Sequence, residues 1–142
     1  MEIMLTPIER VVASGKKIVE GDQSAAARLE RLGDDLGQSV VEDLDAWVVF
    51  LREYSALSLE SREHVLGCRS EYLAQWYSIV EIGQNNGEFR QIDRSFVESI
   101  LGIFVYTLVW SAEPKSSSDL TSSVMELLLH GLMSQKESPV KI

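Results

Sequence analysis

The chain has 142 residues, the usual size of a single domain, with 13 Lys and Arg against 22 Asp and Glu and a net charge of −9. Hydrophobic residues make up 45% and charged residues 25%, which is typical of a folded globular domain and excludes a disordered chain. Because duplex DNA is bound through a basic face that neutralises phosphates, this acidic balance argues against nucleic-acid binding by the chain alone.

Cysteine content and the first residues bear on the cellular compartment. The single cysteine excludes an internal disulfide and any CxxC metal or redox pair. Residues 1–4 are acidic where a secretory signal would be basic, so we expect a cytoplasmic location. Most of the acidic excess lies in residues 21–65, where ten Asp or Glu stand against four Lys or Arg, and we interpret it as a solvated helix face.

The first two predicted helices have clear start signals. Thr6 is placed as an N-cap with Glu9 three residues later, and this helix is expected to reach about Glu20. Asp22, Gln23 and Ser24 then cap a second helix with an apolar stripe from Leu29 to Leu51. Beyond Asp45 this helix gains a second apolar face, so it is expected to be half exposed early and buried all round late. Gly33 and Gly37 inside it mark either a bend or a close contact.

Two further helices complete the middle of the chain. Ser58 or Ser61 caps a third helix that is expected to end near Asn85, where the Asn- and Gly-rich segment 83–87 stops it. Asp93 starts a fourth helix, which is almost wholly apolar from residue 96 to residue 110. That run is too short to span a bilayer, which needs about 20 apolar residues. A helix that is apolar on every side needs cover on every side, so one face is expected to meet a partner.

A fifth helix is predicted over residues 119–133, after the break at Pro114 and the serines that follow it. The chain shows no strand-like alternation, no repeat and no linker between domains. The sequence therefore predicts an all-α single domain of about five helices spanning residues 1–142.

Several motifs, taken in their order and spacing, resemble the C-terminal regulatory domain of TetR-family transcription regulators. The most telling is the G-x-F-x-x-x-D step from Gly87 to Asp93, followed by a Leu-Gly pair and a Trp. The full set comprises Ala27–Leu29, Arg52–Tyr54, Arg69–Tyr72, Ile79, Ile82–Gly83, Gly87–Arg90, Asp93, Leu101–Gly102, Trp110 and Leu128–Leu132. The similarity covers nearly the whole chain.

The resemblance implies an effector-sensing domain that binds a small molecule and dimerises through its last two helices. In that family an N-terminal helix-turn-helix headpiece binds the operator, but no such basic helix pair precedes Thr6 here. DNA binding is therefore not expected of this chain by itself. The resemblance also implies a transcriptional repressor as the parent protein, and a ligand acting through the first helix, residues 6–20.

The apolar run of the fourth helix predicts a homodimer in which the last two helices form a four-helix bundle. Gly102 and Gly131 either allow close approach at this seam or are incidental. The residues expected at the dimer interface are Phe96, Ile100, Ile103, Phe104, Thr107, Val124, Leu128 and Leu132.

Aromatic residues gather on the second and third predicted helices. They either line a pocket for a small apolar or amphipathic ligand, or simply fill the core. The resemblance favours the pocket, and the alternative is a stand-alone helical dimer that binds no ligand. The candidate ligand-binding residues are Trp47, Phe50, Tyr54, Tyr72, Trp76 and Tyr77.

Metal binding and catalysis are not expected. Glu60, His64, Cys68 and Glu71 share one helix face, but no second His or Cys lies nearby to complete a zinc site. Arg52 and Glu53 either anchor a ligand carboxylate or, as we favour, form structural ion pairs. The sequence contains no nucleophile elbow and no phosphate-binding glycine loop, so neither an enzyme nor a cofactor is predicted.

Overall fold

The computed structural model describes residues 6–110 and 116–133, and the side chains of these residues except 107–110 and 116–120. This part of the chain is all-helical, apart from one isolated bridge between Phe89 and Met133. The elements are α1 (Pro7–Val19), α2 (Ala25–Glu42), α3 (Leu44–Glu53), the 3-10 turn η1 (Tyr54–Ala56), α4 (Leu59–Asn85), α5 (Arg94–Trp110) and α6 (Ser116–Leu132). The predicted all-α single domain is confirmed, with six α-helices in place of five.

The first helix begins where the sequence predicts. The backbone N–H of Glu9 donates to the Thr6 hydroxyl at 3.3 Å, and the Thr6 N–H donates to the Glu9 carboxylate at 3.2 Å. These reciprocal bonds form a capping box that satisfies two backbone donors at the start of α1.

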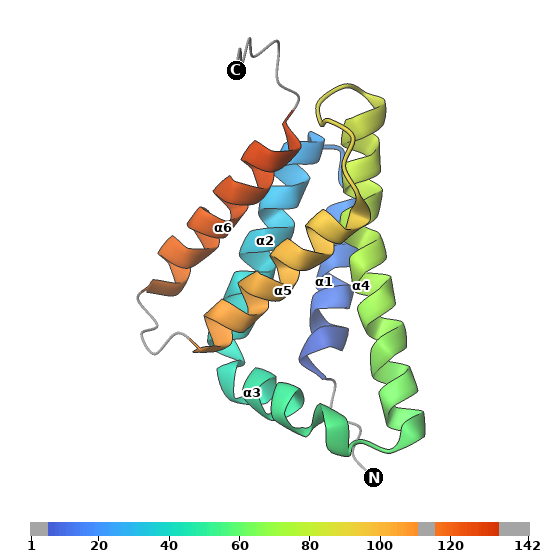
Figure 1. The fold of residues 1–142 in the computed structure, drawn as a ribbon, viewed down its shortest axis with the longest axis vertical. Coiled ribbons are helices and arrows are strands. Elements are labelled where there is room, and N and C mark those ends of the chain that lie inside the picture. Colours follow the sequence, from blue (N-terminus) through green and yellow to red (C-terminus); the bar gives the residue numbers. More distant parts are fainter. Residues whose placement is uncertain (1–5, 111–115, 134–142) are drawn as a thin grey trace, which may run out of the picture.

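The second predicted helix is two helices. The backbone leaves helical geometry at Asp43, where φ is −115° and ψ is 34°. Helix α2 therefore ends there, and α3 begins with its axis in a different direction. Figure 1 shows α3 running across the lower end of the bundle. The apolar pattern changes just beyond this break because the two helices bury different faces, and one continuous helix was the wrong interpretation.

The turn between α4 and α5 depends on Gly87, which has a φ of +84°. Glycine adopts this left-handed conformation without steric cost, so it ends α4 sharply. The N–H of Phe89 then donates to the Gly83 carbonyl at 2.9 Å and its ring is buried. The N–H of Arg90 donates to the Leu132 carbonyl at 2.7 Å, which fastens the turn to the end of α6.

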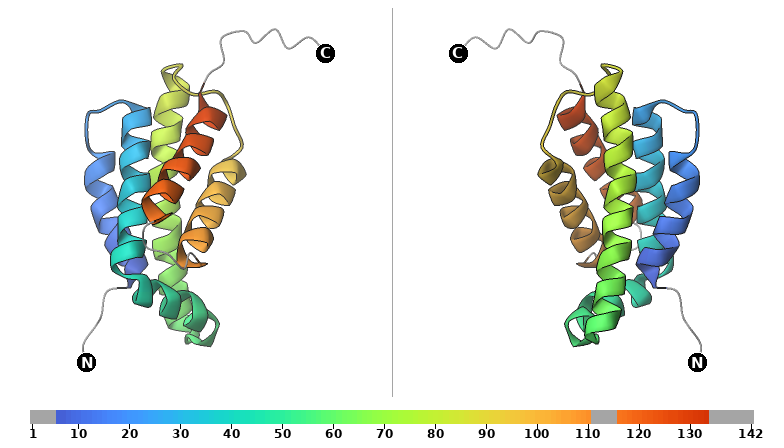
Figure 2. Two further views of the ribbon diagram at one scale, coloured as in Figure 1. Left: turned by 90° about the vertical axis from the view of Figure 1, so that its left-hand side faces the viewer. Right: turned by 90° about the vertical axis from the view of Figure 1, so that its right-hand side faces the viewer.

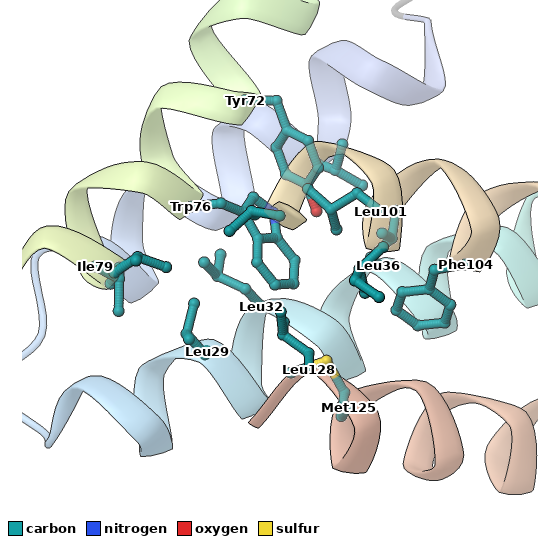
Figure 3. Packing of buried hydrophobic residues seen from close by; sticks show 14 of the residues in the cluster. Leu29, Leu32, Leu36, Tyr72, Trp76, Ile79, Leu101, Phe104, Met125 and Leu128 are labelled. Carbon is teal, nitrogen blue, oxygen red and sulfur yellow. The ribbon is translucent and has the colours of Figure 1, made fainter. Parts of the chain in front are cut away.

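The core forms where α2 is surrounded by the other long helices. Helix α1 packs on α2 and α4, while α5 and α6 pack on each other and on α2 (Figures 1 and 2). Figure 3 shows Leu32 and Leu36 of α2 facing Trp76 of α4, with side chains of α5 and α6 closing the core on the other side. The largest side chains with less than 2% exposure include Trp76, Phe89, Phe104, Leu29, Leu32 and Leu128.

Two glycines of α2 allow α6 to approach closely. A Cβ at Gly33 would meet the Met125 side chain, and a Cβ at Gly37 would meet the Thr121 side chain, at less than van der Waals distance in both cases. Of the two roles open to these glycines, close contact is the one that the structure supports, since α2 continues unbroken through both.

Candidate functional site

A small apolar pocket lies among five helices, with a volume of about 310 Å³. Ile8 of α1 and Leu36 of α2 form part of its wall, and α3, α4 and α5 supply the rest. Its size is at the lower end of the range for ligand sites in proteins. The lining residues are Ile8, Leu36, Trp47, Phe50, Leu51, Arg69, Tyr72, Leu73, Glu98, Leu101, Gly102, Val105 and Tyr106.

Two buried polar atoms lie at or beside this pocket. The Tyr72 side chain is 7% exposed and Trp76 is fully buried, and their rings meet edge to face with centroids 6.3 Å apart. Neither the Tyr72 hydroxyl nor the Trp76 indole nitrogen makes a hydrogen bond of good geometry. Burial raises the pKa of Tyr72 strongly, the neighbouring indole lowers it in part, and the charge of Asp35 raises it further. The phenol therefore keeps its proton at neutral pH.

Arg69 and Glu98 join α4 to α5 at the edge of the pocket. Both residues line it, and their side chains form an ion pair while remaining 48% and 45% exposed. A pair this exposed adds little to stability, because water already solvates both charges. Its consequence is local: the two charges at the edge of the pocket neutralise each other.

A hydrogen bond to α2 and a ring contact within α3 orient the aromatic residues that α3 contributes to the pocket. The Trp47 indole N–H donates to the Ser39 hydroxyl at 3.2 Å, and the ring meets Phe50 edge to face at 6.1 Å. Trp47 is 4% exposed. Its polar atom is thus satisfied within the protein, and only its hydrocarbon surface remains for the pocket.

Three of the six predicted ligand residues line the pocket, namely Trp47, Phe50 and Tyr72. Trp76 lies in the core beside Tyr72. Tyr54 and Tyr77 do not line it: Arg62 lies over the Tyr54 ring at 5.8 Å and Arg94 over the Tyr77 ring at 4.9 Å. The Tyr77 hydroxyl interacts with Glu98 at the edge of the pocket. Ligand binding by the six residues stays a prediction, and these two do not line this pocket.

The pocket wall supplied by α5 was not among the predicted ligand residues. Leu101, Gly102 and Val105 line the pocket, although the apolar run of that helix was interpreted only as an interface. An all-round apolar helix has several faces to cover, and a pocket covers one of them. The Leu101–Gly102 pair belongs to the motifs that resemble the TetR family, and it was the signal in the sequence that pointed to this part of α5.

Comparisons with known proteins agree with this architecture. Residues 22–132 match the family model described as the tetracyclin repressor-like C-terminal domain. The chain belongs to the TetR family. A search of curated proteins finds no match. The fold is similar to the crystal structure of a TetR-family transcriptional regulator, PfmR from Thermus thermophilus. That similarity has a TM-score of 0.79 at 21% identity and covers 90% of this chain and 71% of that one.

Because the matching family model describes a C-terminal domain, the chain is a TetR-type C-terminal regulatory domain. Members of the TetR family are transcriptional regulators and not enzymes. Within the described residues, no helix has the length and apolar character needed to cross a bilayer.

This TetR-type domain also has a larger groove of about 840 Å³ between the start of α1, α3 and the start of α4. Phe50 lines both the groove and the small pocket. Charged side chains border the groove, including Glu53, one of the two residues considered as a ligand anchor. Its many charged lining residues make it the weaker candidate for an apolar ligand.

The face of α4 that was considered for zinc makes protein contacts instead. His64 Nε2 lies 3.6 Å from the Glu9 carboxylate and 3.8 Å from the Cys68 sulfur. Burial raises the pKa of the Cys68 thiol, and the nearby charges of Glu9 and Glu71 add to the shift. In the described part of the chain, no three His, Cys, Asp or Glu residues are grouped to hold a metal ion.

The predicted interface residues of the TetR-type domain divide between its surface and its own core. Ile103 is 56% exposed, and Phe96 and Val124 are half-buried, with Phe96 packed on Gly131. The side chain of Thr107 lies outside the described residues. The remaining four face inward because α5 and α6 pack on each other and on α2, which corrects their assignment: Ile100, Phe104, Leu128 and Leu132.

Proposed function

We propose that this TetR-type domain senses a small, mostly apolar effector in the pocket between α3, α4 and α5. The observation that carries the proposal is a buried Tyr72 hydroxyl without a good hydrogen-bond partner in the wall of an apolar pocket. A buried polar group that lacks a partner is costly to the fold, so one that is kept in the wall of a pocket needs an explanation. A ligand that meets this hydroxyl would offset that cost.

The first helix is placed to respond to a ligand. Ile8 of α1 lines the pocket, and polar contacts fasten the middle of α1 to its neighbours. Gln75 of α4 donates to the Val12 carbonyl at 2.8 Å, and Ser14 donates to Asp35 of α2 at 2.5 Å. A ligand would shift α1 only as far as it binds one arrangement of these helices better than another.

We further propose that the domain forms a homodimer through the outer face of α5 and α6. Large apolar side chains are exposed on both helices, with Ile103 at 56%, Tyr106 at 63% and Leu127 at 58%. Apolar side chains gathered on adjacent helices mark interaction surfaces in soluble proteins. Gly102 and Tyr106 also line the pocket, so on α5 the proposed dimer face lies next to the pocket.

The experiment that tests effector sensing is a screen of small hydrophobic compounds. A ligand in the pocket contacts Trp47, so binding changes tryptophan fluorescence and raises the melting temperature by mass action. If a broad screen moves neither signal, a helical interaction protein without a ligand becomes the better account.

A further inference from the structure

We propose that the effector is a small uncharged molecule, mostly apolar, with one acceptor oxygen that receives a hydrogen bond from Tyr72. This inference rests on the proposed function and adds the chemical class of the ligand. Three features of the pocket carry it: its lining, its charge and its one buried donor without a good partner, the Tyr72 hydroxyl, since Arg69 and Tyr106, which also line it, are exposed.

The lining sets the size and the apolar character of the ligand. Most of the pocket wall is hydrocarbon, and its volume of about 310 Å³ admits only a small compound. Burial of apolar surface then supplies most of the affinity. The apolar side chains of the wall are Ile8, Leu36, Phe50, Leu51, Leu73, Leu101 and Val105.

The charge of the pocket favours an uncharged ligand. Arg69 and Glu98 are the charged side chains among the described lining residues, and they pair with each other. A ligand carboxylate that captured Arg69 would leave Glu98 beside it without its partner. An anionic group placed deeper would be removed from water and would face the charge of Asp35, which already acts on Tyr72.

The donor chemistry identifies the polar group. The Trp76 indole N–H can only donate, so any hydrogen bond between the two side chains runs from Trp76 to the Tyr72 oxygen. The Tyr72 O–H therefore still needs an acceptor. Figure 3 shows the Tyr72 ring reaching from α4 towards Leu36 and Leu101, both of which line the pocket. The Trp47 indole is already bonded to Ser39. The group that Tyr72 can serve is therefore an acceptor such as a carbonyl or ether oxygen.

The test uses a pair of probes with nearly the same shape. Acetophenone carries a carbonyl where 2-phenylpropene carries a C=CH₂ group, so they differ in the acceptor and little else. Affinities are measured by titrating the ¹⁵N-labelled chain and following its indole and backbone resonances. We expect wild type to bind acetophenone about three- to tenfold more tightly than 2-phenylpropene, the worth of one hydrogen bond. Benzoate, the charged relative, is expected to bind more weakly than acetophenone.

Two variants separate the hydroxyl from the ring. Tyr72→Phe keeps the ring and is expected to lose the preference for acetophenone and to favour 2-phenylpropene, because the bound carbonyl then has no donor. Tyr54→Phe removes a hydroxyl outside the pocket and keeps the ring under Arg62, so it is the matched control and keeps the wild-type preference. Because the preference is measured first in wild type, a Tyr72→Phe chain that fails to fold leaves the proposal open to refutation.

The outcomes are distinct. Equal binding of the two uncharged probes by wild type would overturn the acceptor, while the proposed effector pocket would stand. Tighter binding of benzoate than of acetophenone would overturn the uncharged class. A failure of both uncharged probes to bind at millimolar concentration would count against the proposed function, and this inference would fall with it.

Discussion

Arg10 of α1 pairs with Asp43, the residue at which α2 gives way to α3, with 3.2 Å between Nε and Oδ2. The contact joins the helix proposed to respond to the ligand to the break that sets the direction of α3. Helix α3 carries Trp47 and Phe50 into the pocket, so the position of one wall depends on where α1 lies.

Replacement of Arg10 by Ala is expected to weaken ligand binding more than it weakens the fold. Both side chains of the pair are more than a third exposed, so its loss should cost at most ~1 kcal/mol of unfolding free energy. Affinity for a pocket ligand is expected to fall several-fold, measured by titration. Arg52→Ala, an exposed change on α3 itself, is the control and should leave affinity unchanged. Equal losses of affinity in the two variants would contradict this coupling.

The capping box of α1 gives a pH-dependent prediction. Burial raises the pKa of Glu9, but the hydrogen bonds from Thr6 and the charge of His64 outweigh it, so the pKa lies below its usual 4.5. The Glu9 carboxylate therefore stabilises the fold above pH 4.5, and this contribution is lost as the pH falls through the lowered pKa. Glu9→Gln should lower the unfolding free energy at pH 7, and the difference between the two chains should shrink as the pH falls from 4.5 through the lowered pKa. Urea titrations measure the unfolding free energies of wild type and Glu9→Gln. A difference between them that grows as the pH is lowered would refute this account.

The contact between α2 and α6 predicts opposite effects for two glycines. Gly37→Ala places a methyl group against Thr121 and should destabilise the fold by about 1–3 kcal/mol. Gly67→Ala, in the exposed middle of α4 with open space around it, should stabilise the fold by up to about 1 kcal/mol. Chemical denaturation of the two variants compares them directly, and similar changes in both would show that the close approach is unimportant.

The proposed dimer predicts different failures for neighbouring residues of α5. Ile103→Asp puts a charge on the exposed face and should yield a folded monomer, seen by analytical ultracentrifugation with an unchanged helical circular dichroism spectrum. Phe104→Asp buries a charge in the chain's own core and should unfold it, since an uncompensated buried charge costs several kcal/mol. A wild-type chain that sediments as a monomer at micromolar concentration would refute the dimer.

Helix ends were predictable from the sequence because local signals determine them. Thr6 with Glu9, the serine at position 58 and the positive φ of Gly87 each act within a few residues, so boundaries of α1 and α4 follow from the chain. The break at Asp43 was missed because no proline or glycine marks it. It depends instead on where α3 packs, and a contact with Arg10 of α1 accompanies it.

The candidate site was predicted less completely, because membership of the site depends on the side of its helix to which each side chain points. Aromatic residues on α3 and α4 point to several sides, and only packing separates Tyr72 from Tyr77, five residues along α4. The same holds for α5, where Phe104 faces the core while Ile103 faces outward. An all-round apolar pattern gives no preferred face, so the sequence could not assign these roles.

The most direct test of the central claim, that the pocket binds a small apolar ligand, is the melting-temperature shift caused by acetophenone in two tryptophan variants. Leu73→Trp fills the pocket, whereas Leu66→Trp adds the same ring to an exposed position of α4 outside it. The account predicts that acetophenone raises the melting temperature of wild type and Leu66→Trp but not that of Leu73→Trp. An equal shift in all three chains, or no shift in wild type, would contradict it.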